Sequence, residues 1–285
     1  MLDSSRQQNR TLLVFSLLGA AIYLFHSRPA WAAEPADSIC TALCTHLQPT
    51  KTGGKTQLGA SADAKAFADA AQAAVTAAGL PSFSGVISCT CDGVVFTVKV
   101  NIDVAGDGNA DNSTGNQDLV ISVGGDANPT GNNNGDGSTA TNTGNGAAVA
   151  VGGDGGGGGS PPGNGGQATA STQNGGDAIA RGGNAGGATN SGGNGGNATA
   201  SVAGADDNSD ARAQGGDGGD PGNNNNAGGN GGSANTSYSG TTSNNGGASG
   251  GSGSAGTPGT HGTGASSSSN STGSTSTPGS SANNQ

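Results

Sequence analysis

Residues 178–203 read AIARGGNAGGATNSGGNGGNATASVA and show the pattern that dominates the chain. Short alternating segments lie between clusters of glycine, asparagine and aspartate. Five of these segments begin at Ala148, Ala168, Ala178, Ala188 and Ala198. Their ten-residue spacing is broken once, near Gly158. A fixed period of this kind indicates a structural repeat, which extends over residues 146–240.

The composition supplies no conventional hydrophobic core for this repeat. Glycine accounts for 59 of 285 residues, aromatic side chains for 3% and charged side chains for 10%. Such glycine enrichment without a strict Gly-X-Y period is typical of low-complexity chains. Glycine also loses the most conformational entropy when it becomes ordered. Order in the repeat therefore requires that the backbone itself packs, through hydrogen bonds and close contacts.

Two ordered structures and one disordered state agree with the repeat. Alternating Ala-x-Ala segments joined by glycine turns predict short β-strands in a meander or roll. A weaker three-residue bias in the glycines predicts polyproline II helices packed side by side, because that helix has three residues per turn. Low hydrophobicity favours disorder in the isolated monomer. The sequence leaves all three open.

The first 32 residues are typical of a secretory signal peptide. Arg6 and Arg10 precede an apolar run over residues 12–25, and Ala30-Trp31-Ala32 matches the small-residue cleavage pattern. The run is shorter than the roughly 20 residues of a membrane-spanning helix. We therefore expect a secreted protein, extracellular or on the cell surface, with no membrane span in the mature chain.

Residues 33–104 predict a small α+β head domain. A helical segment over residues 37–47 precedes a second helix, for which Ser61 is the expected N-cap and Gly79 the stop. The Asp92-Gly93 pair predicts a two-residue hairpin turn. The expected fold class is thus a disulfide-stapled α+β head followed by a Gly/Ala-rich low-complexity repeat region.

Four cysteines are expected to form two disulfides between the first helix and the hairpin. Cys40 and Cys44 lie four residues apart, on one face of a helix, and Cys89 and Cys91 lie two apart, on one face of a strand. The hairpin register places Cys89 opposite Phe96. Two pairings remain open: Cys40–Cys91 with Cys44–Cys89, or Cys40–Cys89 with Cys44–Cys91. Disulfides are the usual state of cysteines in a small exported domain.

Residues 103–111 resemble the calcium-binding loops of the EF-hand and dockerin type. The oxygen ligands at positions 1, 5, 7 and 9 are Asp103, Asp107, Asn109 and Asp111. The segment departs from the pattern because Ala105 is at position 3 and Thr114 is at position 12, where the family has a bidentate acid. The resemblance implies calcium binding, and the competing interpretation is an acidic turn. Residues 105–145 otherwise predict an acidic Gly/Asn linker with one strand, over residues 117–123.

The charge balance and the residue types exclude several functions. The net charge is −10, and an acidic chain that is poor in lysine is not expected to bind nucleic acid. After the signal peptide the chain has only His46 and His261, and no nucleophile, base and acid occur in a catalytic arrangement. We expect no enzymatic activity and no cofactor other than calcium.

Three family resemblances concern the repeat. Residues 192–200, GGNGGNATA, are similar to the nonapeptide of calcium-binding β-rolls. The glycine clusters resemble those of arthropod glycine-rich antifreeze proteins, whose flat polyproline II bundles bind ice. The export signal, small head and Gly/Asn/Ala region together resemble bacterial secreted and surface glycine-rich repeat proteins.

Two functions follow as expectations. Short strands without blocked edges favour an extracellular structural protein that self-associates through its glycine-rich repeats, as a filament, matrix or surface component. The alternative is an ice- or calcium-binding repeat protein, in which regularly spaced residues such as Thr169, Thr189 and Thr199 form a flat surface. Residues 241–285 have the Ser/Gly/Thr composition of a disordered tail.

Overall fold

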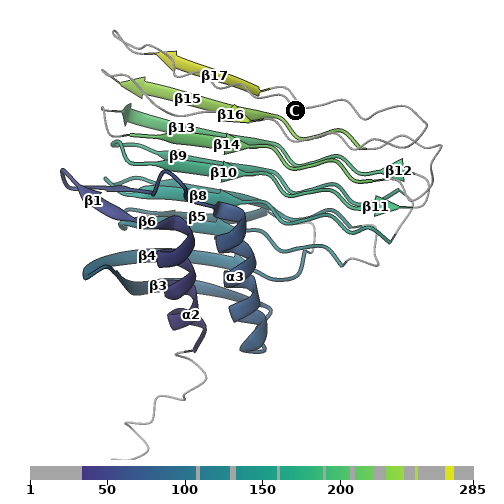
Figure 1. Ribbon diagram of the computed structural model, residues 1–285, viewed down its shortest axis with the longest axis horizontal. Helices are drawn as coiled ribbons and strands as arrows, with labels where there is room; N and C mark the ends of the chain where they lie inside the picture. The colour runs from purple at the N-terminus through teal and green to yellow at the C-terminus, as the bar shows by residue number, and fades with distance from the viewer. Residues whose placement is uncertain are drawn as a thin grey trace, which may run out of the picture.

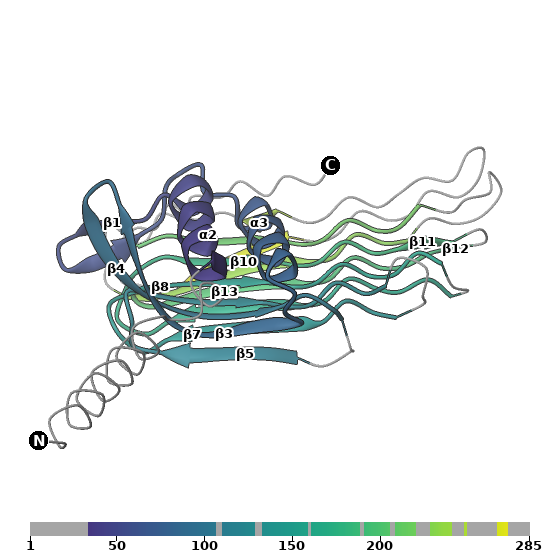
Figure 2. The same ribbon diagram turned by 90° about the horizontal axis from the view of Figure 1, so that it is seen from below.

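The computed structural model describes residues 34–106, 110–128, 133–158, 161–188, 191–205, 209–220, 229–240, 248–249 and 267–272. The predicted signal peptide and most of the predicted tail lie outside these residues. The described chain forms three layers: two helices, a seven-stranded sheet and a six-stranded sheet (Figure 1). Figure 2 shows the helices on one face of the sheets, with the strands β5 and β7 on the far side.

The starts of both helices differ from the prediction: the first helical segment begins at Glu34 and not at residue 37, and the second has another N-cap. Helix α2, Glu34–Ala42, continues into a single π-helical turn, η2, Leu43–Leu47. Helix α3, Ala64–Ala77, is capped by Asp63, whose carboxylate accepts hydrogen bonds from the backbone N–H groups of Lys65 and Ala66, both 3.0 Å long. The expected cap, Ser61, is wrong because Asp63 has the extended backbone that directs its side chain at the first turn.

Two antiparallel strand pairs lie between residues 50 and 103. Strands β1, Thr50–Thr52, and β2, Lys55–Gln57, form a small separate sheet. Strands β3, Ser82–Cys91, and β4, Val94–Asp103, pair in antiparallel fashion with Cys89 opposite Phe96, which confirms the predicted register. Both residues of the Asp92-Gly93 turn have positive φ, as the two-residue turn requires.

All other pairs in the two large sheets are parallel. We call the seven-stranded sheet, in the order β16-β14-β10-β8-β6-β4-β3, the helix-side sheet. Its remaining strands are β6, Leu119–Val123; β8, Ala147–Val151; β10, Ala178–Arg181; β14, Ala211–Gln214; and β16, Ala248–Ser249.

The six-stranded sheet is the outer sheet, in the order β17-β15-β13-β9-β7-β5. Its strands are β5, Ala110–Gly115; β7, Gly137–Asn142; β9, Ala168–Thr172; β13, Ala198–Ala205; β15, Ala234–Gly240; and β17, Ser267–Thr272. The chain alternates between the two sheets as it advances, and this arrangement is a parallel β-solenoid.

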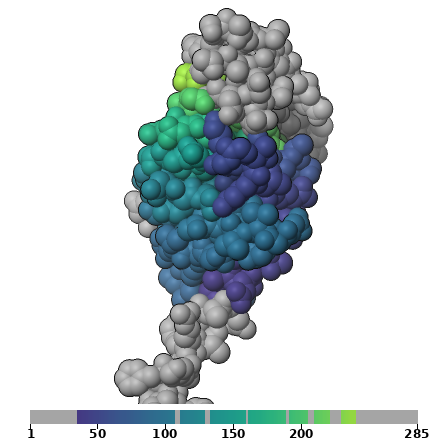
Figure 3. Space-filling model, turned by 90° about the vertical axis from the view of Figure 1, so that its left-hand side faces the viewer, coloured from purple at the N-terminus to yellow at the C-terminus, as the bar shows by residue number. Residues whose placement is uncertain are grey.

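One coil of the solenoid is about 30 residues long. Ala168 on β9 pairs with Ala198 on β13, and Ala148 on β8 pairs with Ala178 on β10. The ten-residue spacing of the sequence therefore marks thirds of a coil: an outer strand, a helix-side strand and a glycine-rich excursion. Ala188 lies in the excursion, in strand β11, Gly187–Ala188, which pairs with β12, Ser191–Gly192. Figure 3 shows the side opposite these excursions, at the left of Figure 1, where the coils stack in chain order from blue to green.

The excursions form a layered structure that we call the glycine bundle. It comprises residues 133–136, 152–158, 163–167, 182–186, 193–197, 215–219 and 229–233, and extends beyond the strands at the right of Figures 1 and 2. The N–H groups of Gly152 and Gly155 donate to carbonyls of the next coil, at 2.9 and 2.8 Å. Those of Gly153 and Gly156 donate to the opposite layer, at 2.9 Å each. The hydrogen bonding repeats every three residues. The coils approach so closely that a Cβ atom on Gly153 would lie 2.0 Å from the carbonyl oxygen of Gly125, which is why the residues at these positions are glycine.

The predicted fold class, a separate α+β head followed by low-complexity repeats, is wrong. Strand β4 of the expected head pairs in parallel with β6, where Val98 lies opposite Leu119. Strand β6 pairs in turn with β8 of the repeat. The head hairpin is therefore part of a solenoid sheet, and the repeat is ordered within one chain. The prediction failed because it assumed that a core needs large side chains, whereas the core between the two sheets consists largely of alanine.

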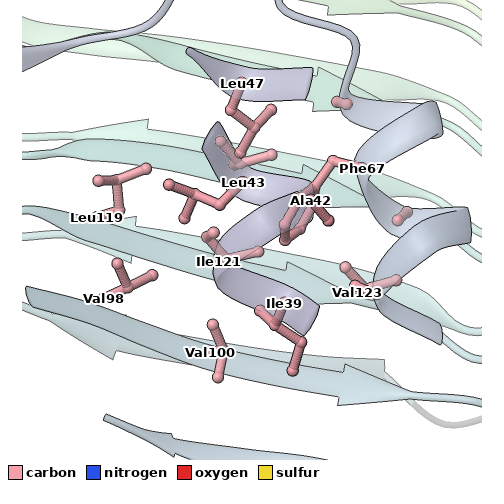
Figure 4. Packing of buried hydrophobic residues seen from close by; sticks show 14 of the residues in the cluster. Ile39, Ala42, Leu43, Leu47, Phe67, Val98, Val100, Leu119, Ile121 and Val123 are labelled. Carbon is pink, nitrogen blue, oxygen red and sulfur yellow. The ribbon is translucent and has the colours of Figure 1, made fainter. Parts of the chain in front are cut away.

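Two clusters of buried hydrophobic side chains connect the helices, the helix-side sheet and the outer sheet. The first lies between the helices and the helix-side sheet, where Ile39, Leu43 and Phe67 are buried with Val100 and Ile121 (Figure 4). The second lies between the two sheets and is mostly alanine. Its members are Val120, Ala140, Ala148, Ala150, Ala168, Ala170, Ala178, Ala180, Ala198, Ala200, Val202, Ala211, Ala213, Ala234 and Tyr238. Small side chains on both inner faces allow the two sheets to pack closely.

Candidate functional site

The outward side of the outer sheet carries two rows of short hydroxyl and amide side chains. The first row is Asn112, Thr139, Thr169, Thr199 and Asn235, and the second is Thr114, Thr141, Ser171, Ser201 and Ser237; each residue pairs in register with the next in its row. Burial alternates along the strands, so that Ala168 and Ala170 of β9 are buried while Thr169 is exposed. The rows therefore point away from the interior. We call this surface the hydroxyl face.

The hydroxyl face is regular in two directions. Neighbouring parallel strands lie about 4.8 Å apart, and alternate residues along one strand lie about 6.6 Å apart. The hydroxyl of Ser171 donates a hydrogen bond of 3.1 Å to that of Thr141, which fixes part of the second row. No member of either row is charged or aromatic. The surface is thus a regular array of hydroxyl and amide groups on a sheet of parallel strands.

Asparagine and aspartate side chains hold the glycine bundle at the same spacing. In its outer layer, the N–H of Asn164 donates to Oδ1 of Asn134, and that of Asn194 donates to Oδ1 of Asn164, each at 2.8 Å. In the helix-side layer, the N–H of Asp154 donates to Oδ1 of Asp126 at 2.7 Å. The Gly-Gly-Asn and Gly-Gly-Asp clusters thus supply acceptors for backbone donors of the following coil, a role that the sequence did not suggest.

The four cysteines form the two disulfides that were expected. Cys40 pairs with Cys89, and Cys44 pairs with Cys91, so that one of the two open pairings is observed. Both bridges connect the first helical segment with β3. They fix the helix layer to the edge of the helix-side sheet.

The predicted calcium ligands are brought together only in part. Carboxylate oxygens of Asp103 and Asp111 lie within 4.8 Å of one another and of a carboxylate oxygen of Asp136. Asp107 and Asn109 lie outside the described residues. Asp136 precedes β7 and is 1% exposed. The sequence did not predict Asp136 as a ligand, because this residue lies one coil after Asp111. The one sequence signal for Asp136 was an acidic residue at the start of an alternating segment.

Asp177 connects the loop before α3 to the solenoid. Its side chain is 2% exposed; Oδ2 accepts a hydrogen bond from the N–H of Leu58 at 2.6 Å, and Oδ1 accepts one from that of Asp210 at 2.9 Å. Burial raises the pKa of Asp177 to about 6, the negative charge of Asp210 adds to the increase, and the two hydrogen bonds oppose it. Nη1 of Arg212 donates to the carbonyl of Ala60 at 3.2 Å, beside the same loop.

We expect Asp177 to make the free energy of unfolding decrease as the pH rises from about 4 to about 6. Its pKa of about 6 in the folded state exceeds the ordinary value of 3.8, so the folded state binds the proton more tightly. The stabilisation is complete below pH 4 and lost above pH 6, a difference of about 3 kcal/mol. Urea unfolding of the native protein and of Asp177→Asn between pH 4 and pH 7 measures this effect.

The difference between native protein and variant isolates Asp177. Burial also raises the pKa of Asp126 and of Asp210. Both groups therefore make the free energy of unfolding decrease with pH in the native protein and in the Asp177→Asn variant alike. A difference in unfolding free energy that stays constant from pH 4 to pH 7 would contradict the assignment to Asp177.

The fold and the hydroxyl face define a class: a parallel β-solenoid with a glycine bundle along one side, a disulfide-linked helix layer on one sheet and a flat polar face on the other. No protein-family model, curated protein or solved structure matches the chain. Within the part of the chain that the structure describes, neither helix is long and apolar enough to cross a membrane.

Proposed function

We propose that this protein is a secreted, non-enzymatic protein that binds ice through its hydroxyl face. The observation that supports this function is the pair of rows through Thr169 and Ser171, which is regular both along and across the strands. A crystal lattice is recognised by many weak contacts at fixed spacing, so that a flat, uncharged, periodic surface is required. The two disulfides agree with export to an oxidising compartment.

The rigidity of the face favours this kind of ligand. Threonine has few side-chain rotamers, and a sheet of parallel strands fixes the backbone beneath it. Little side-chain entropy is therefore lost when the hydroxyl and methyl groups contact an ordered layer of water. Exposed asparagines of the glycine bundle, among them Asn164 and Asn194, continue the polar surface beyond the strands.

We expect the purified protein to show thermal hysteresis and to be enriched in a growing ice phase. Thr169→Lys should reduce both effects strongly, to less than about half of the native value. The reason is that Thr169 lies between Thr139 and Thr199 in the centre of the first row, where a long charged side chain prevents close approach. Thr76→Lys is the matched control, because Thr76 is exposed on α3, on the opposite side of the molecule.

Two results would contradict the proposal that the protein binds ice. The first is a concentrated native protein without thermal hysteresis and without enrichment in ice. The second is equal activity in Thr169→Lys and Thr76→Lys, which would mean that the hydroxyl face is not the surface in contact with ice.

An extracellular structural protein that self-associates is the second candidate. The edge of the helix-side sheet favours it: β3 pairs only with β4, and Val86 on β3 is 57% exposed. An open strand edge offers backbone groups that a second copy can pair with. In the two large sheets the strands from β6 to β14 are already paired on both sides, so assembly would proceed through the ends of the solenoid. Light scattering of the same sample distinguishes the candidates, because a strictly monomeric protein does not form filaments.

A further inference from the structure

The layer between the two sheets changes in chemistry at the N-terminal end of the solenoid. In the outer sheet, the inner positions in register are Ser138, Ala168, Ala198 and Ala234. In the helix-side sheet, they are Asn101, Ser122, Ala150, Ala180 and Ala213. At these inner positions the later coils have alanine, whereas the first coil has serine or asparagine, whose side chains carry oxygen atoms. Since alanine packs well at the same positions elsewhere, packing alone does not require the polar side chains.

Three carboxylates converge on this polar part of the layer. Asp103 ends β4, Asp111 lies in β5 and Asp136 precedes β7; one oxygen atom of each lies within 4.8 Å of the others. Asp136 is almost completely buried, and Asp111 accepts a hydrogen bond of 3.4 Å from Nδ2 of Asn101. Negative charges this close repel one another strongly where water is excluded. A bound cation removes that repulsion.

Ser138 is an independent indication of a ligand. Its side chain is 3% exposed, and its Oγ has no hydrogen-bond partner among the described residues. The strand register places Ser138 opposite Asp111 on the neighbouring strand. The two-residue alternation places it on the same inner face as Asp136. A buried hydroxyl without a partner is unfavourable, so this serine in place of alanine needs a group to which its oxygen can bind.

We propose that Asp103, Asp111, Asp136 and Ser138 bind a divalent cation, with a preference for Ca²⁺ over Mg²⁺. Carboxylate and hydroxyl oxygens are the hard ligands that both ions accept. Ca²⁺ tolerates irregular geometry and higher coordination numbers, whereas Mg²⁺ requires a near-octahedral shell and keeps several waters. Ligands from three strands in two sheets suit the less demanding ion. The cation connects the helix-side sheet to the outer sheet in the first coil.

This site differs from the loop that the sequence resembles. Asp136 and Ser138 come from the next coil, so that strand stacking assembles the ligands. Asp103 and Asp111 are half-buried and Asp136 is buried, on the inner side of the outer sheet and away from the hydroxyl face. Calcium binding and ice binding can therefore succeed or fail independently.

The test uses the purified full chain, treated with a chelator, and Ca²⁺ alone as the probe. Calorimetric titration should show calcium binding, and the melting temperature should rise with calcium and less with magnesium. Ser138→Ala should weaken calcium binding at least about tenfold, and Asp136→Asn should weaken it further. Ser138→Ala should fold, because alanine occupies this position in the later coils. Asp92→Asn, which removes one charge from the exposed β3–β4 turn, should bind calcium as the native protein does.

Three results would overturn the proposal. One is a native protein that binds no calcium at millimolar concentration. Another is an affinity that is the same in Ser138→Ala, Asp136→Asn and the native protein. The third is an equal loss in Asp92→Asn, which would indicate general attraction to an acidic protein instead of a defined site.

Discussion

Replacing Gly183 with alanine should destabilise the protein by more than about 3 kcal/mol. A Cβ atom on Gly183 would lie 1.9 Å from the carbonyl oxygen of Gly153 in the preceding coil. That oxygen is a backbone atom, so it cannot move aside by a rotamer change, and the two coils must separate. The hydrogen bond from the N–H of Gly183 to the carbonyl of Gly166, 2.9 Å long, would be strained with them. Urea unfolding followed by circular dichroism measures the change.

Gly85→Ala is the matched control for Gly183→Ala. Gly85 lies in β3, and a Cβ atom there would have no atom within 4 Å. We expect its effect on the free energy of unfolding to stay within about 1 kcal/mol and to be favourable if the strand geometry suits alanine. Similar stability of the two variants would show that the glycine bundle does not need glycine at Gly183.

Local features of the first hundred residues could be predicted because single residues determine them. The Asp92-Gly93 pair selects one turn type, and that turn sets the register that places Cys89 opposite Phe96. The disulfide pairing could not be chosen, since both alternatives use the same faces of the same elements. The direction in which α2 crosses β3 decides it, and that direction depends on packing against the helix-side sheet.

The solenoid itself could not be predicted from the residues, for two physical reasons. The visible spacing is ten residues, but the positions that stack, such as Ala168 and Ala198, are a full coil apart. The stabilising contacts are also made by alanine and by the backbone, so counting large apolar residues gives no sign of a core. Of the proposed surface residues, Thr169 and Thr199 are neighbours in one row, and Thr189 lies outside the described residues.

Removing one disulfide, by Cys40→Ser together with Cys89→Ser, should lower the free energy of unfolding by about 2 to 5 kcal/mol. The Cys44–Cys91 bridge remains and closes nearly the same loop, so the unfolded chain gains only the freedom of the short ring between the two bridges, and the expected loss is at the lower end of this range. It also releases α2 from β3, a strand that pairs on one side only. Urea unfolding against Ser88→Ala, a change at an exposed position of the same strand, provides the measurement and its control.

The pairing itself is tested by a single substitution. Cys44→Ser should leave Cys91 as the one free thiol and keep the Cys40–Cys89 bridge intact, which thiol labelling followed by peptide mapping detects. Labelling at Cys89 would contradict the observed pairing. The bridges attach α2, whereas α3 and the strands from β6 onward do not depend on them for their hydrogen bonds. The part of the helical signal that comes from α2 should therefore be lost at lower urea concentration than the strand signal in the disulfide variants. Simultaneous loss would mean that the helix layer and the solenoid unfold as one cooperative unit, and that the alanine-rich layer depends on the helices above it.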